Sequence, residues 1–209
     1  MNAIVTAIEK HRLAALQDGV YSIAMTLLVL ELKLPPLPEH LSDPMLWSAL
    51  LDIWPKLLTW LLSFWVLAVF WIGDARALTV FEAVDTFLLR LSLWRLALVS
   101  LIPFSTAFIG EHGNRAAGAA VYSAHLFLLA TAQVLRNTYA HLRPEQVAWP
   151  SEDTRLDAIV QSWVTLVCAA VAFGLSFLAP GFNMLALLPL LFTRHARRFW
   201  SKRTARHAS

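Results

Sequence analysis

Cysteine is almost absent from this chain: Cys168 is the single one among 209 residues. One thiol cannot build an intrachain disulfide framework, and no CxxC pair is present for a metal or redox site. Cys168 lies within an apolar run, where we expect a small packing residue. The sequence also lacks HExxH, GxSxG, Walker and GxGxxG motifs. We therefore expect no enzyme activity, no catalytic residues, no cofactor and no bound metal.

Charge is scarce as well. Only 15% of the residues are charged and 58% are hydrophobic, with a mean hydropathy of +0.58, whereas a soluble domain is about 25% charged. Three stretches carry no charge at all: 57–72, 116–135 and 159–178. A helix needs about 20 mostly apolar residues to cross a bilayer. A buried core helix could explain one such stretch but not several, so the sequence predicts an all-α polytopic membrane protein.

The apolar stretches and the turn signals between them predict six spans in one transmembrane domain over 1–209. They are 6–32, 47–72, 87–109, 116–135, 159–178 and 182–200. Ser151 is a predicted N-cap before the acidic first turn of the fifth helix. Pro189 interrupts the short apolar part of the sixth span and a basic segment follows it, which leaves an interfacial amphipathic helix as the alternative there.

The basic residues indicate an orientation. If the N-terminus is cytoplasmic, the outside segments hold only Lys33, Lys56 and Arg115, and Arg95 lies within the third span. The inside segments then hold Lys10, Arg12, Arg76, Arg90, Arg136, Arg143, Arg155, Arg194, Arg197, Arg198, Lys202, Arg203 and Arg206. This asymmetry predicts that both termini are cytoplasmic. No small-residue cleavage site follows the first apolar run, so we expect that span to remain in the protein. Because the basic residues sit at span ends, the membrane explains them and we expect no nucleic-acid partner.

The first helix carries two stripes. Asp18, Ser22 and Thr26 follow one another at i, i+4 and i+8. An aliphatic stripe of Ile23, Leu27 and Leu30 runs beside them over about 10 Å of helix. The aliphatic residues could simply face lipid, and hydroxyls in such helices often satisfy a backbone carbonyl.

An acid near membrane depth is costly unless it is paired or hydrated, so Asp18 is a candidate for function or for a polar network. The available charges are Arg12 on the same helix, Asp74 at the end of the second span, and Arg90 and Arg95 in the third. His125 lies alone in the fourth span. No ligand partners lie at metal-binding spacing from it, so we expect an interhelical hydrogen bond.

The stretch RLAALQDGVYSIAMTLLVLELKLP, residues 12–35, resembles the first-helix signature of the transmembrane protein 175 family, the endolysosomal potassium channels of animals and their bacterial relatives. Arg12, Asp18, Gly19 and the run 26–30 match that signature, and Leu16-Gln17 replaces a Phe-Ser pair. FWIGDAR, residues 70–76, is similar to the end of the family's second helix, although many relatives have histidines where Gly73-Asp74-Ala75 stands. SLIPFSTAFIGEHGN, residues 100–114, looks like its third-helix segment.

The resemblance implies a potassium-selective channel in the inner (plasma) membrane of a bacterium. Animal members carry two six-helix units and form dimers, so a one-unit chain is expected to form a homotetramer within membrane lipid, with its first helices lining a central pore. Carried over by position, Ile23, Leu27 and Leu30 form the constriction and Thr26 adds a hydroxyl layer, with Ser22 beside the pathway. The resemblance also assigns structural roles to Arg12 and Asp18.

Potassium would be the permeant ion, and the preference for it over sodium would arise at apolar rings rather than at a carbonyl filter, which this sequence lacks. Asp74 and Arg95 are the further members expected in the structural network. The alternative is a proton- or cation-coupled secondary transporter that uses Asp18 as its intramembrane acid. The chain has neither an inverted repeat nor a pair of broken helices, which are typical of many such transporters.

Overall fold

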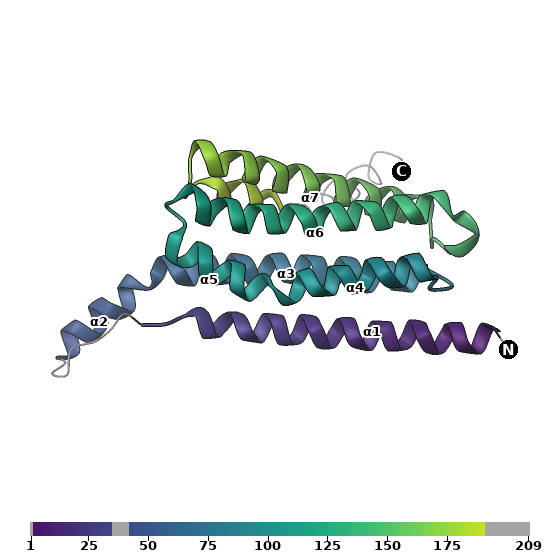
Figure 1. Ribbon diagram of the computed structural model, residues 1–209, viewed down its shortest axis with the longest axis horizontal. Helices are drawn as coiled ribbons and strands as arrows, with labels where there is room; N and C mark the ends of the chain where they lie inside the picture. Colours follow the sequence, from purple (N-terminus) through teal and green to yellow (C-terminus); the bar gives the residue numbers. More distant parts are fainter. Residues whose placement is uncertain (1, 35–41, 191–209) are drawn as a thin grey trace, which may run out of the picture.

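The computed structural model describes residues 2–34 and 42–190, and these form a bundle of helices (Figure 1). In chain order the elements are α1 (Asn2–Leu27), η1 (Leu28–Glu31), α2 (Asp43–Asp52), α3 (Trp54–Val80), α4 (Thr86–Ser100), α5 (Ile102–His112), α6 (Ala116–Leu142), η2 (Pro144–Gln146), α7 (Glu152–Leu178) and η3 (Asn183–Leu187).

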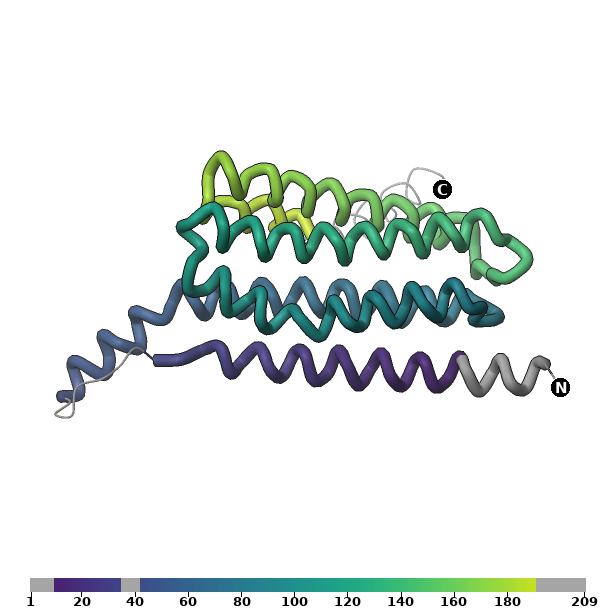
Figure 2. The backbone as a smooth tube through the Cα atoms, in the orientation of Figure 1, coloured from purple at the N-terminus to yellow at the C-terminus, as the bar shows by residue number. Residues whose placement is uncertain are grey.

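The long helices run lengthwise beside one another, and α1 lies along one edge of the bundle (Figures 1 and 2). Five helical segments of the described chain are long and apolar enough to cross a membrane: 10–31, 54–80, 86–112, 116–142 and 152–178. Each of them overlaps one of the first five predicted spans, which confirms the helical membrane-protein class, although several bounds differ. α6 is the most buried of them.

The second span starts later and ends later than predicted. Residues 43–52 form the separate helix α2, which leaves the bundle obliquely at the end opposite the N-terminus (Figure 1). The helical path is interrupted at Ile53. α3 then begins at Trp54 with Pro55 in its first turn, where no backbone N–H is needed for a hydrogen bond within the helix. At its other end α3 runs eight residues beyond Ile72, because Asp74 is paired inside the bundle and does not end the helix.

The third span is two helices. α4 ends at Ser100 and α5 begins at Ile102 with Pro103 in its first turn. The hydrogen bond from the Leu101 N–H to the Leu98 carbonyl, 3.0 Å, tightens the last turn of α4. This break lies where proline removes a backbone donor.

The fourth and fifth spans are longer than the charge-free runs that predicted them. α6 continues past Leu135 because Arg136 and Asn137 are buried and hydrogen-bonded. Arg136 was therefore assigned wrongly to an inside loop. α7 begins at Glu152, and the Ser151 hydroxyl accepts from the Thr154 N–H at 3.2 Å, which confirms the predicted N-cap.

The sixth predicted span, 182–200, falls mostly outside the described residues. Its described part contains the 3-10 helix η3, where Asn183 donates to the Ser123 hydroxyl on α6 at 2.9 Å. A sixth crossing stays a prediction.

Two hydrophobic clusters hold the helices together. The larger joins α1 to α3, α4, α5, α6 and α7 through residues such as Tyr21, Leu67 and Leu126. The smaller lies around Leu13, Leu78 and Leu88, where the α3–α4 and α6–α7 connections meet. These two connections pair as an isolated β-bridge between Phe81 and Val147, and the Lys10 ammonium donates to the Phe81 carbonyl at 2.5 Å. α1 is thus fixed along its inner side.

Candidate ion pathway and buried charge cluster

α1 has one buried face, which continues into η1. On α1 it holds Leu13, Gln17, Tyr21 and Ala24, which recur at helical spacing, and Leu28 of η1 extends it; all are less than one-tenth exposed. They pack on the rest of the bundle, so the orientation of α1 about its own axis is defined by the fold.

The predicted aliphatic stripe lies on the exposed side of α1. Ile23, Leu27 and Leu30 are 60%, 41% and 61% exposed in the single chain. Leu30 lies in the 3-10 helix η1, where residues advance about 120° each instead of 100°. The stripe is therefore not a straight α-helical row at this end, although all three side chains face outward.

The predicted polar stripe is exposed as well. Ser22 and Thr26 lie on the same outer side, and the Thr26 hydroxyl donates to the carbonyls of Ser22 (3.0 Å) and Ile23 (2.9 Å). Because the hydroxyl proton of Thr26 bonds these backbone carbonyls, the lone pairs of its oxygen remain available to coordinate a cation. The aliphatic stripe and the hydroxyls of Ser22 and Thr26 thus lie on the exposed side of α1 and η1 in the single chain.

Asp18 and Arg12 do not join the other two residues expected in the network. The Asp18 carboxylate accepts a 2.8 Å hydrogen bond from the indole N–H of Trp71 on α3 and remains exposed. Arg12 is exposed and has no hydrogen bond or ion pair with another described residue. Asp18 therefore links α1 to α3 at the surface, outside the bundle interior.

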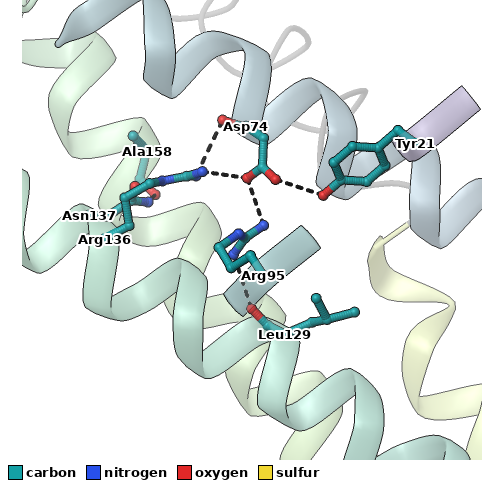
Figure 3. Close-up of polar contacts among 8 residues, drawn as sticks. Tyr21, Asp74, Arg95, Leu129, Arg136, Asn137 and Ala158 are labelled. Carbon is teal, nitrogen blue, oxygen red and sulfur yellow. Dashed lines mark hydrogen bonds and ion pairs between the residues drawn. The ribbon is translucent and has the colours of Figure 1, made fainter. Parts of the chain in front are cut away.

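Asp74 and Arg95 do come together, in a fully buried cluster (Figure 3). The Arg95 guanidinium donates to Asp74 Oδ1 at 2.6 Å, and Arg136 from α6 donates to the same oxygen. The Tyr21 hydroxyl from α1 donates to Oδ2 at 2.7 Å. Asp74 and Arg95 are each only 1% exposed. One carboxylate thereby ties together α1, α3, α4 and α6.

The cluster holds two guanidiniums and one carboxylate, so its formal charge is +1. Arg95 also donates to the Leu129 carbonyl at 3.1 Å, and its guanidinium lies 5.8 Å from the centre of the Phe70 ring, which favours a buried cation. The Nε atoms of Arg95 and Arg136 have no partner among the described residues. This arrangement binds helices together and leaves no free carboxylate for an ion.

His125 has the predicted interhelical role. Its Nδ1 lies 2.9 Å from the Ser105 hydroxyl on α5, and its Nε2 lies 2.8 Å from the Leu98 carbonyl on α4. It therefore bridges the break between α4 and α5. Cys168 is half-buried against the larger hydrophobic cluster. No group of three His, Cys, Asp or Glu side chains within residues 2–34 and 42–190 could hold a metal ion.

Comparison with known proteins identifies the family. The model of a family described as "Endosomal/lysosomal potassium channel TMEM175" matches residues 12–103, which include most of α1, the α4–α5 break and three members of the cluster, Tyr21, Asp74 and Arg95. A potassium channel from Chamaesiphon minutus is 32% identical over 179 residues, covering 82% of this chain and 86% of that protein. The chain belongs to the TMEM175 family.

One further protein and one solved structure are also similar to this chain. A potassium channel from Streptomyces collinus is 34% identical over 138 residues, covering 64% of this chain and 65% of that protein. The crystal structure of a lysosomal potassium-selective channel TMEM175 homologue from Chamaesiphon minutus superposes with a TM-score of 0.76 at 28% identity. It covers 90% of this chain and 97% of that one. TMEM175 proteins are ion channels, so this chain is an integral membrane channel protein and not an enzyme.

Tyr21 and Arg136 are the cluster members that the sequence analysis did not identify. Tyr21 lies on the buried face of α1, opposite the aliphatic and hydroxyl stripes, and a tyrosine within an apolar helix is not by itself a signal for a polar network. The spacing of Gln133, Arg136, Asn137 and Ala140 is a signal for Arg136, since these positions share one helical face.

Proposed function

We propose that this TMEM175 protein conducts potassium in preference to sodium along a pathway lined by α1, in a single channel domain over 1–209. The observation that carries the proposal is the outer face of α1. Its opposite face is fixed in the bundle, while Ile23 and Leu30 are about 60% exposed beside the Thr26 hydroxyl. Large aliphatic residues at this exposure need either lipid or other copies of α1 around them.

An apolar constriction would select through the cost of dehydration. Aliphatic rings offer few ligands to replace an ion's water, so the ion that rearranges its hydration more cheaply passes more easily, and such a ring can also close by dewetting. Potassium is the larger and less tightly hydrated of the two ions. We therefore expect a preference for it that is weaker than that of a cage of carbonyl oxygens, with Thr26 supplying an oxygen ligand inside the narrow section.

Reconstitution into lipid vesicles tests this function. With potassium on one side and sodium on the other, the reversal potential should correspond to a potassium preference, and the current should rise with ion concentration without early saturation. A flux that saturates and needs a proton or sodium gradient would instead identify the coupled transporter that uses Asp18. Ile23→Asn in the same vesicles should lower the potassium preference, because an amide hydrates the apolar ring.

The pathway requires assembly, because one α1 cannot enclose a pore. We expect a homotetramer with the four α1 helices innermost and the other helices in contact with lipid, since identical subunits close most simply in a cyclic arrangement. Native mass measurement or stepwise cross-linking in mild detergent should give a largest species of four chains. A species that stops at two chains would contradict the four-fold pore.

The orientation follows from the positive residues. We expect both termini on the cytoplasmic side of a bacterial inner membrane, which also requires a sixth crossing after α7. A reporter that is active only in the periplasm, fused after Ser209, should give no signal, while the same reporter inserted after Asp43 should be active. Activity at Ser209 would mean that the chain crosses five times or is inverted.

A further inference from the structure

The short helix α2 carries an apolar surface outside the bundle. Its two most exposed apolar side chains are Trp47 and Leu51, at 68% and 74%, and they lie one turn apart on the same face. Ala49, the buried residue of this helix, lies two positions from each of them, about 160° around the helix axis. α2 thus has a covered side at Ala49 and a free apolar side at Trp47 and Leu51, which we call the α2 patch.

The α2 patch lies beyond the end of the spanning segment. That segment, 54–80, begins directly after the break at Ile53 and contains 27 residues. At 1.5 Å per residue it is about 40 Å long, whereas the hydrocarbon core of a bilayer is about 30 Å thick. α3 is therefore long enough to cross the hydrocarbon by itself. This leaves α2 at or beyond the headgroups, where acyl chains do not cover its apolar side.

The charges of α2 do not suit a helix that lies on the membrane surface. Such helices are rich in Lys and Arg on their polar face, because these residues bind anionic headgroups. α2 contains no basic residue, and its two acids, Asp43 and Asp52, are both exposed. Anionic headgroups would repel these carboxylates. A lipid surface is thus a poor partner for the α2 patch.

α2 extends toward the side of the bundle on which α1 lies. In Figure 1 it runs past the end of α1 and toward the edge that α1 forms, while α7 forms the opposite edge. Because α1 packs its buried face on the bundle, its free face with Ile23 and Leu30 looks outward at this same edge. On the proposed function, on which this inference rests, that free face meets the α1 helices of the other subunits. α2 therefore projects toward the same neighbours.

We propose that the α2 patch is a subunit contact, in which Trp47 and Leu51 pack against a second copy of this chain at the end of the bundle opposite the N-terminus. Helices within lipid associate without a hydrophobic driving force, because acyl chains are as apolar as leucine. Outside the hydrocarbon, apolar burial is driven by the release of water. The α2 patch therefore adds a contribution to assembly that the spanning helices cannot supply.

Cysteine labelling tests this contact, because Cys168 is the single cysteine of the chain. Leu51→Cys in a Cys168→Ala background is treated with a water-soluble maleimide in three states: in lipid vesicles with reagent on both sides, as a tetramer in mild detergent, and as subunits dissociated by harsh detergent. Labelling in the first two states should be at least about tenfold slower than in the third, because the contact must open before the thiol reacts. Trp47→Cys, on the same face, should behave in the same way.

Leu178→Cys in the same background is the matched control. Leu178 is the last residue of α7 and is 83% exposed. It lies at the same end of the bundle as α2 but at the edge opposite α1 (Figure 1). Its labelling rate should therefore be the same in the mild-detergent tetramer and in the dissociated subunits.

The three states separate the possible partners of the α2 patch. Rapid labelling of Leu51→Cys in the intact tetramer would overturn the proposal: lipid covers the patch if labelling is slow only in vesicles, and water does if it is rapid there too. A protein that stays monomeric in mild detergent would overturn the contact and the four-fold pore together. Protection of Leu51→Cys in a channel without potassium preference would support the contact and contradict the proposed function, so the two failures are distinguishable.

Discussion

Asp74→Asn should cause the largest loss of stability of any conservative substitution in this protein. The carboxylate accepts from Arg95, Arg136 and Tyr21 and is 1% exposed. The amide removes the only negative charge from the cluster and leaves two buried guanidiniums without a counter-ion. Breaking a buried ion pair in this way costs about 3–5 kcal/mol. We expect the apparent melting temperature to fall by roughly 6–20 °C and the yield of folded oligomer to fall with it.

The cluster contains two positive groups and one negative group, and this imbalance provides a control. Arg136→Gln leaves Asp74 and Arg95 as a neutral pair, so it should cost much less than Asp74→Asn although it alters the same site. Asp18→Asn is the second control, because Asp18 is exposed and its single bond from Trp71 can be kept by the amide carbonyl. Equal losses in Asp74→Asn and Arg136→Gln would contradict an energetic account based on net buried charge.

The location of this cluster separates what the sequence predicts from what it does not. Hydropathy located five spanning segments, because apolar side chains in a membrane need no specific partner. The sequence analysis also placed Asp74 and Arg95 in a structural network, together with Arg12 and Asp18. It did not predict which groups pair, because pairing depends on how α1, α3, α4 and α6 are rotated against one another, and no single-helix pattern contains that information.

The positions of the helix ends were also predicted poorly, because they too depend on which polar groups are paired inside the bundle. The charge-free run ends at Leu135, which suggested that Arg136 lies outside the membrane helix, yet α6 runs on to Leu142. A charged residue ends an apolar run but does not end a helix whose next turn is buried and paired. The same holds for α3 beyond Asp74. Trp47 was assigned to the second span because residues 47–51 of α2 are mostly apolar, and only the break at Ile53 separates α2 from α3.

The second large effect is a change in ion selectivity. It decides which of the two stripes of α1 lines the pathway. Both are exposed in the single chain, so their exposure fits either as the lining of the pathway. If Ile23, Leu27 and Leu30 form apolar rings, Ile23→Asn places an amide where water was excluded. The ring should widen and hydrate, so conductance should rise and the potassium-to-sodium permeability ratio should fall toward one.

Thr26→Val gives the opposite test with a nearly identical shape. It removes an oxygen whose proton already bonds the carbonyls of Ser22 and Ile23, so the helix loses only a local bond. With apolar rings setting selectivity, this variant should keep most of the potassium preference. If instead the polar stripe lines the pathway, Thr26→Val should have the larger effect and Ile23→Asn a small one.

Reversal potentials of the two variants, measured side by side under the same potassium and sodium gradients, distinguish these alternatives. Val171→Asn is the control for placing an amide at an exposed position of a spanning helix, since Val171 on α7 is 48% exposed and lies on a different helix from the proposed pathway. Its permeability ratio should equal that of the unaltered protein. Melting temperatures measured on the same samples verify that each variant is folded. An unchanged ratio in folded Ile23→Asn would refute the apolar constriction, because a ring that sets the dehydration cost of the ion cannot gain an amide from each subunit without altering that cost.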